Sequence, residues 1–554
     1  MTGDWRPDLQ VRQGNIMAHR FRLTVLAAVL CAAACGTRTG PAASAQPARP
    51  PLTEADVTAI AELLQLEDSR RFVEPTLTRL LASTHSEVRR RAVVTVGRIV
   101  NERSLALLEP LRTDADPNIV ATVAFAMGQT RNSAAVPWLT TTMNAWEVNP
   151  DAAFEAARSL GKTRSPEGRA NLEAFLATAP DASGARAVVG EALLSLGRFT
   201  ETGTIDPILR WTTSTDVEVR WRATWALFRP RNPAAVSHLM TLSTDPSPEV
   251  RFWAVRGLVP TLVPDRAVAS ARLRDALKDS DRRVRTESLR VLMTYDDDAS
   301  VAAVLAELEN PDTWMSVSAA ETLGRHTSRV DQVRPRLEAA MDPSKPAALQ
   351  TVAKQQLTRL TAPPPDPAGR TGGAGRAGGA RAGGVGGVGN AGPAERERAI
   401  SDYRAIVERW IVPAYKGAPN PRAIWMTSKG EIELELFAAD APLGMEELVR
   451  LTESKAIVGP AFTRLVPNFV AQQATIPGAS RLRDEVNRHG LTRANLAWAS
   501  SGLDTGRPGY TLGNTPQPHN EGDFTSLGRV VRGMDVVDRL ELGDAITSAW
   551  FIRR

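Results

Sequence analysis

The sequence predicts a multidomain protein in which an all-α solenoid of helical repeats is followed by a small closed β-barrel capped by helices. Three observations support this prediction. A helical segment recurs at intervals near 31 residues within residues 52–360. A Pro/Gly/Ala-rich stretch follows at 361–394, and beyond residue 422 the hydrophobic period changes from that of a helix to that of a strand. A chain of 554 residues is also too long to form a single core.

The composition indicates a folded protein without metal or thiol chemistry. Hydrophobic residues make up 43% of the chain and charged residues 23%, which excludes wholesale disorder. The 67 Lys and Arg against 62 Asp and Glu give a net charge of +5, too weak a field to predict a nucleic-acid partner. Both cysteines lie in the first apolar stretch and the six histidines show no ligand spacing, so we expect neither a metal site nor a cofactor.

The first 35 residues predict a signal peptide. Arg20 and Arg22 precede an apolar run at 23–34, which is too short to span a bilayer but suits the core of an export signal. Either Met1 or Met17 is the true start, because residues 1–16 add nothing to such a signal.

The apolar run ends in a sequence that resembles a bacterial lipobox, Ala-Ala-Ala-Cys35-Gly. The resemblance implies that Cys35 is lipidated, that residues 36–51 form a tether, and that the protein is anchored in the bacterial cell envelope, facing the periplasm or the exterior. Cleavage at Ala43-Ser44-Ala45 would instead give a secreted protein, and a wrongly assigned start would give a cytoplasmic one.

About nine units of a helical repeat are expected in residues 52–360. Their shared apolar positions have helical spacing, as in Val250, Trp253, Ala254 and Leu258. One helical hairpin cannot bury its apolar face alone, so stacking into a right-handed solenoid is expected. The recurring segments are 85–99, 116–130, 152–163, 185–199, 216–228, 247–259, 281–293, 312–324 and 346–360.

Arg89, Arg220, Arg251 and Arg285 occupy one position of a D-x-x-V-R pattern. This pattern resembles HEAT repeats, including the variety first noted in phycobilin lyases, and the resemblance implies an array that binds a protein partner. We expect these arginines to pair with aspartates of the adjacent repeat. The alternative is a functional basic stripe.

Four tryptophans also fall within the repeats. We expect Trp221, Trp225, Trp253 and Trp314 to fill layers between helices, and the alternative is that they form a ligand groove.

The stretch 361–394 is predicted to be a linker, because a Gly-rich segment cannot bury enough surface to fold. Its G-x-G-x-x-G match at 373–378 is not a dinucleotide motif, since no strand precedes it and no helix follows. Residues 395–421 are expected to form a connecting helix.

Residues 422–554 begin with a predicted hairpin, 423–427 and 432–436, and a helix at 441–454. Four blocks then carry a family resemblance: TSKGEIELELFAADAP at 427–442, AFTRLVPNFVAQQ at 461–473, RDEVNRHGLTRANLAWASSG at 483–502, and FTSLGRVVRGMDVVDRLELGD at 524–544. Together they resemble the cyclophilin-type peptidyl-prolyl cis-trans isomerases, which implies a cyclophilin-like closed β-barrel and rotation about X–Pro bonds of exported proteins.

The resemblance also implies the site residues. In the F-x-R-x-x-P-x-F-x-x-Q pattern, Arg464 is the catalytic guanidinium, Phe469 a pocket wall and Gln472 a polar partner of the substrate. For Phe462 the alternative is a role in the barrel core. The other implied substrate-binding residues are Phe462, Val470, Ala499, Ser500, Thr511, His519 and Phe524.

Two departures from the family put activity in doubt. Gly509 stands where the family has a substrate-binding Gln, and Thr511 stands where it has the aromatic floor of the proline pocket. We therefore hold two hypotheses: an isomerase whose repeat array recruits Pro-containing clients, and a weakened or inactive adaptor that binds Pro-containing segments. A scaffold that uses only the solenoid is a third.

Overall fold

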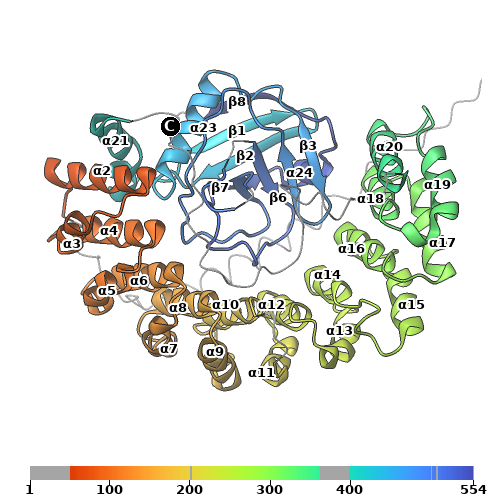
Figure 1. Ribbon diagram of the computed structural model, residues 1–554, viewed down its shortest axis with the longest axis horizontal. Helices are drawn as coiled ribbons and strands as arrows, with labels where there is room; N and C mark the ends of the chain where they lie inside the picture. Colours follow the sequence, from red (N-terminus) through yellow and green to blue (C-terminus); the bar gives the residue numbers. More distant parts are fainter. Residues whose placement is uncertain (1–49, 200–202, 362–397, 501, 507–508, 553–554) are drawn as a thin grey trace, which may run out of the picture. The chain divides into compact units, whose positions relative to one another are not determined.

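The repeat array is built from helical hairpins stacked side by side (Figure 1). The computed structural model describes residues 50–199, 203–361, 398–500, 502–506 and 509–552. The predicted signal peptide, Cys35, nearly all of the tether and nearly all of the linker lie outside these residues.

Each of the nine recurring segments forms one helix, and these helices line the inner side of a curved array (Figure 1). A further helix precedes them, and successive members pack directly on one another. The inner helices are α2 (Glu54–Ser69), α4 (Ser86–Ile99), α6 (Pro117–Thr130), α8 (Pro150–Thr163), α10 (Arg186–Leu196), α12 (Val217–Phe228), α14 (Pro248–Arg256), α16 (Arg282–Leu292), α18 (Thr313–Leu323) and α20 (Ala347–Thr361).

The outer helices are shorter and alternate with the inner ones along the chain (Figure 1). Several are preceded or followed by a turn of 3-10 helix, as at Glu109–Thr113 and Arg210–Thr213. The outer helices are α3 (Glu74–Leu81), α5 (Ser104–Leu108), α7 (Val136–Asn144), α9 (Pro166–Thr178), α11 (Asp206–Leu209), α13 (Val236–Leu242), α15 (Arg266–Ala276), α17 (Asp298–Ala306) and α19 (Val330–Ala339).

Glycine at one repeated position allows the inner helices to approach closely. A Cβ atom on Gly97 would lie 2.9 Å from Ala126 on the next inner helix, and one on Gly128 would lie 2.1 Å from the Oγ of Ser159. A larger side chain at either position would therefore push neighbouring repeats apart.

The repeated arginines bridge neighbouring repeats, as expected. Each guanidinium forms an ion pair with an aspartate one repeat further on and also donates to a backbone carbonyl before its own helix. The structure therefore supports the pairing interpretation rather than a basic stripe. The pairs are Arg89–Asp114 at 2.8 Å, Arg220–Asp245 at 3.1 Å, Arg251–Asp279 at 2.7 Å and Arg285–Asp312 at 3.4 Å.

Three of the four tryptophans fill layers between helices. Trp221, Trp225 and Trp253 are buried, with ring centroids 6.3 Å apart for Trp221–Trp253 and 4.7 Å apart for Trp225–Trp253. Trp314 is only half-buried and lines a pocket described below.

The segment after residue 397 returns to the first inner helix, where the Tyr403 hydroxyl donates to Asp68 at 2.8 Å. The predicted connecting helix is broken here into α21 (Ile400–Ile406), a π-helical turn (Val407–Ile411) and α22 (Val412–Tyr415). Pro413 explains the break, because proline has no N–H to donate to the preceding turn.

The C-terminal domain is an antiparallel sheet of eight strands in the order β3-β4-β6-β5-β7-β2-β1-β8. The edges meet, because an Ala461–Ala545 bridge joins them and the Phe462 N–H donates to the Asp544 carbonyl at 2.7 Å. The strands are β1 (Arg422–Thr427), β2 (Gly430–Leu436), β3 (Phe462–Val466), β4 (Val470–Gln473), β5 (Asn495–Trp498), β6 (Tyr510–Gly513), β7 (Gly528–Arg532) and β8 (Ile546–Phe551).

Two helices, α23 (Pro442–Glu453) and α24 (Met534–Arg539), pack on the sheet and share its hydrophobic core. The fold class is therefore the predicted one, a helical-repeat solenoid followed by a barrel capped by helices.

The solenoid and the barrel belong to one compact unit, Leu52–Arg554. Cations near the C-terminal ends of the inner helices donate to backbone carbonyls of barrel loops. Arg98 donates to the carbonyls of Asp440 and Val486 at 2.6 and 2.9 Å, and its side chain is only 2% exposed. Lys162, also 2% exposed, donates to the Gly522 carbonyl at 2.6 Å.

Candidate functional site

The strand register places the predicted catalytic arginine in a row of polar side chains. Arg464 on β3 pairs with Gln472 on β4, and Gln472 pairs with Thr511 on β6. Because side chains alternate along a strand, the neighbours Leu465 and Leu512 turn into the buried core while this row keeps contact with solvent.

Arg464 is exposed and held in place by two of the predicted partners. Its Nη1 donates to Gln472 Oε1 at 2.9 Å, and its guanidinium carbon lies 5.8 Å from the centroid of the Phe469 ring. No carboxylate among the described residues forms an ion pair with it. Burial lowers the pKa of Arg464, and the nearby Glu321 carboxyl opposes this shift. The guanidinium thus faces solvent with its charge available to a substrate.

The turn between β3 and β4 fixes the position of Phe469. Asn468 has a φ of +58°, a conformation that Asn adopts readily, and its side chain donates to the Arg283 carbonyl of the solenoid at 2.8 Å. The Thr515 hydroxyl donates to the Asn468 carbonyl at 2.8 Å. Both the barrel and the solenoid therefore hold this turn.

His519 links the barrel site to the solenoid. Its ring stacks on Phe469 with centroids 6.0 Å apart and on Trp225 of α12 with centroids 6.2 Å apart. The ring keeps solvent contact between these neighbours. Desolvation, together with the charges of Arg229, Arg256 and Arg198, lowers the pKa of His519 to about 3. The imidazole is therefore neutral at physiological pH.

The other predicted residues divide into two groups. Phe462 is fully buried in the barrel core, so its side chain has the core role that was the alternative to substrate binding. Val470 is 4% exposed. Ala499, Ser500 and Phe524 are half-buried. The structure thus brings Arg464, Gln472, Thr511, Phe469 and His519 together and places Phe462 away from them.

The structure shows the surroundings of Gly509 and Thr511, the two departures from the family. A Cβ atom on Gly509 would lie 2.5 Å from the Gln473 carbonyl oxygen and 2.6 Å from that of Ala474, so the end of β4 leaves no room for a side chain. Thr511 donates its hydroxyl proton to the Ala497 carbonyl at 3.2 Å. Gly509 is therefore required by local packing, whereas Thr511 leaves the floor of the site polar.

The solenoid turns three residues toward this site, and sequence reasoning missed two of them, Arg229 and Glu321. Trp225 lies in the last turn of α12 and was expected to fill a layer between helices, with a ligand groove as the alternative. Arg229 follows the end of α12, and Glu321 lies on α18. Burial raises the pKa of Glu321 to about 7, against the opposing charges of Arg325 and Arg464.

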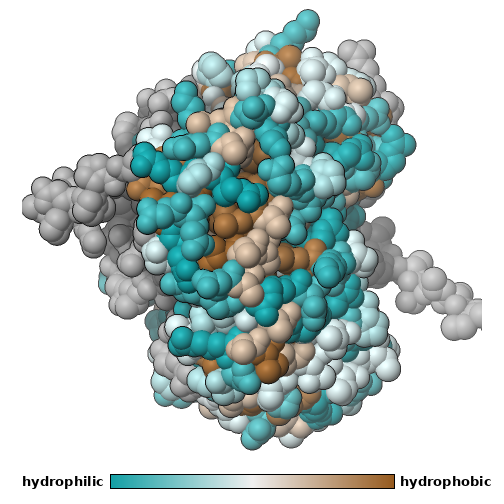
Figure 2. Space-filling view, turned by 90° about the vertical axis from the view of Figure 1, so that its right-hand side faces the viewer, coloured by the Kyte–Doolittle hydropathy of each residue, from teal (hydrophilic) through white to brown (hydrophobic). Residues whose placement is uncertain are grey.

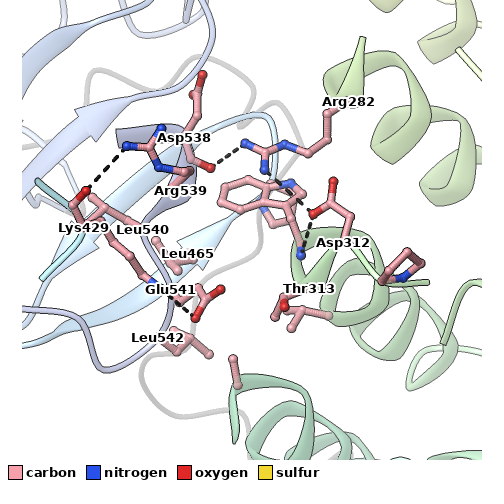
Figure 3. A pocket seen from close by; sticks show the side chains of 15 residues that line it. Arg282, Asp312, Thr313, Lys429, Leu465, Asp538, Arg539, Leu540, Glu541 and Leu542 are labelled. Atoms are coloured by element: carbon pink, nitrogen blue, oxygen red, sulfur yellow. Dashed lines mark hydrogen bonds and ion pairs between the residues drawn. The ribbon is translucent and has the colours of Figure 1, made fainter. Parts of the chain in front are cut away.

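A separate pocket of about 380 Å³ lies between α18 and the barrel (Figure 3). Trp314, Val317, Leu465 and Leu540 contribute its apolar lining, and an ion pair between Lys429 and Glu541 crosses its barrel side at 3.1 Å. It shares no residue with the predicted site. The face of the molecule in Figure 2 also gathers hydrophobic residues into a patch bordered by hydrophilic ones.

The structure thus defines a class of protein in which helical repeats are joined to a closed eight-stranded barrel. The barrel carries an exposed arginine in a row of polar side chains. Residues 423–553 match the family model "Cyclophilin type peptidyl-prolyl cis-trans isomerase/CLD", and residues 106–194 and 182–259 match the HEAT repeat model.

The chain is 34% identical over 137 residues to a peptidyl-prolyl cis-trans isomerase of Helicobacter pylori, covering 23% of this chain and 83% of that protein. It is 30% identical over 135 residues to one from Synechococcus elongatus, covering 23% of this chain and 93% of the relative. A solved cyclophilin-type isomerase of Cryptosporidium parvum is 15% identical, with a TM-score of 0.23 over 24% of this chain and 99% of the other. The chain belongs to the cyclophilin-type peptidyl-prolyl cis-trans isomerases, and its C-terminal domain is the enzyme.

Proposed function

We propose that this protein rotates X–Pro peptide bonds in polypeptide clients and that Arg464 lowers the rotational barrier. The observation that carries the proposal is the geometry of Arg464: it is exposed, has no carboxylate ion pair among the described residues, and is oriented by Gln472 and Phe469. A guanidinium held in this way can donate to the proline amide, where charge shifts as the bond twists.

The reaction needs neither a nucleophile nor a proton transfer. Amide resonance sets a barrier of ~18–20 kcal/mol. Twisting the bond breaks this resonance and leaves a lone pair on the prolyl nitrogen, so a hydrogen bond donated to that nitrogen stabilises the twisted state. Phe469 and His519 offer apolar ring faces for the proline, and Gln472 can bind the flanking backbone. The neutral state of His519 suits this role, since a charged ring would be a poor wall for proline.

The Arg464→Ala variant tests the proposal. We expect kcat on a short Pro peptide to fall by at least about 100-fold, which corresponds to ~3 kcal/mol of lost transition-state stabilisation, while peptide affinity changes less. Arg529→Ala is the matched control, because Arg529 is exposed on the same barrel and, within the part of the chain that the structure describes, forms an ion pair with Glu435 alone.

The protein is instead an adaptor if it binds Pro peptides but neither the wild type nor Arg464→Ala isomerises them faster than buffer alone. The polar floor at Thr511 is the observation that favours this second candidate.

For location, we propose that the protein is exported and anchored in the cell envelope through Cys35, and the lipobox-like sequence supports this. Among the described residues, no helix has the length and apolar character needed to cross a membrane. A Cys35→Ser variant should move from the membrane fraction to the soluble exported fraction. Unchanged fractionation would exclude the anchor.

For the solenoid, we propose two roles: it binds the barrel on its inner side, and its remaining surface offers a protein partner a place to dock. The contacts of Arg98 and Lys162 support the first role. The match to HEAT repeats supports the second.

A further inference from the structure

A row of cations follows the C-terminal ends of the inner helices, and most of its members bind the barrel. Arg98, Lys162 and Arg198 donate to barrel carbonyls, the last to those of Pro518 and Glu521 at 3.3 and 2.9 Å, and Arg131 pairs with Asp523 at 2.8 Å. A helix dipole favours a cation at this end, and the barrel supplies the acceptors that these side chains contact.

Arg229, the next member of the row, breaks this pattern. It caps α12, its side chain is exposed, and no acceptor or carboxylate partner contacts it among the described residues. Its guanidinium carbon lies 5.7 Å from the centroid of the Trp225 ring, which itself stacks on His519.

A continuous series of stacked groups therefore joins two guanidiniums. Arg464 lies over Phe469, Phe469 stacks on His519, His519 stacks on Trp225, and Arg229 lies over Trp225. One end of the series is the predicted catalytic group, and the other end belongs to the solenoid.

The charges that act on Arg229 are positive. Desolvation, together with the charges of Arg231, Arg164 and Arg198, lowers the pKa of Arg229. An anion from outside would relieve this repulsion.

We propose that Arg229, supported by Arg164 and Arg231, forms a subsite that binds a carboxylate of the client close to the proline, so that the solenoid gives the isomerase a preference for acidic Pro-containing segments. An extended peptide advances ~3.3 Å per residue. A proline beside Phe469 and His519 therefore places an Asp or Glu about two to four residues away within reach of Arg229. This inference rests on the proposed isomerase function.

The test uses the full chain and peptides with a single Ala–Pro bond. One Asp is moved through four positions on each side of the proline, and a matched series carries Asn at the same positions. We expect at least a fivefold higher kcat/KM for Asp than for Asn at one or more positions, and a loss of this preference in Arg229→Gln.

Arg79→Gln is the matched control, because it removes the same charge from an exposed solenoid position that pairs with Glu62. It should keep the preference. In the wild type, the preference should also fall between about 0.02 and 0.5 M salt, since screening shortens the Debye length over this range.

The inference is overturned if no position shows a preference, if Arg229→Gln keeps it, or if Arg79→Gln loses it equally. Failure of the isomerase proposal is recognised separately, because the Asn peptides would then not be isomerised. Binding constants for the Asp and Asn peptides, measured by fluorescence anisotropy on wild type and Arg229→Gln, still decide whether the subsite exists.

Discussion

Two groups of cations on the same repeats contact different parts of the molecule. The repeated arginines, such as Arg251, pair with an aspartate of the next repeat and stay within the solenoid. The cations at the ends of the inner helices, such as Arg98 and Lys162, reach across to backbone carbonyls of the barrel. The first group joins repeat to repeat, and the second joins solenoid to enzyme.

The comparison shows that a repeat protein can bind a partner domain without disturbing its own periodic contacts. The two groups differ in burial: the side chain of Arg98 is 2% exposed, whereas that of Arg251 is 13% exposed. A buried charge is costly unless its hydrogen bonds are complete, so the buried members of the second group, Arg98 and Lys162, should be more sensitive to substitution.

The largest expected effect is that of Arg98→Ala. It leaves the buried Glu67 without its ion-pair partner, with only the Thr95 hydroxyl as a donor among the described side chains, and removes donors from the carbonyls of Asp440 and Val486. We expect a loss of ~3–5 kcal/mol in the free energy of unfolding, measured by denaturant titration. Hydrogen exchange should rise in the barrel loops at 439–440 and 484–488. A loss no larger than that of Arg251→Ala would remove the distinction between the two groups.

A smaller effect is expected from Arg251→Ala. It breaks a partly buried pair with Asp279, and we expect a loss of ~1–3 kcal/mol by the same titration. Faster hydrogen exchange should appear near residues 245–279 and not in the barrel loops. Faster exchange in the loops would mean that the repeated arginines also hold the barrel.

The smallest expected effect concerns Glu321, an inner-side acid rather than a cation. Because its pKa is raised to about 7, it is neutral below that pH and negative above it, where it partly offsets the charge of Arg464. We expect kcat/KM on a neutral peptide to fall a few-fold as pH rises through about 7. The raised pKa of Glu321 also affects stability. As pH rises from 4.5 to about 7, the free energy of unfolding decreases, because in this range the folded state binds more protons than the unfolded state.

Glu321→Gln should remove the step in the pH profile. A step of equal size in the variant would assign it to another group.

The sequence predicted the structure correctly where the same physical requirement recurs along the chain. The helix positions, the pairing of Arg89, Arg220, Arg251 and Arg285, and the barrel fold all followed from periodic or blockwise patterns. The contacts that Arg98 and Lys162 make with barrel carbonyls could not be predicted, because a backbone carbonyl looks the same at every residue. Arg98 and Lys162 therefore resemble ordinary surface cations of a helix.

The site shows the same limit. The F-x-R pattern identified the row around Arg464, but Gly509 looked like a lost substrate contact, and only the closeness of the Gln473 carbonyl shows why glycine is needed. Trp225 and Arg229 are distant from the barrel in sequence, and only the fold places them beside His519.

The central claim is that solenoid and barrel form one enzyme, and the most direct test is to sever the chain between them. A specific protease site placed within residues 370–381 would separate the two parts covalently. If the claim holds, the two fragments co-elute from a size-exclusion column at the mass of the intact protein and keep its kcat/KM on a Pro peptide. Fragments that elute separately, with the barrel piece alone as active as the intact chain, would contradict it.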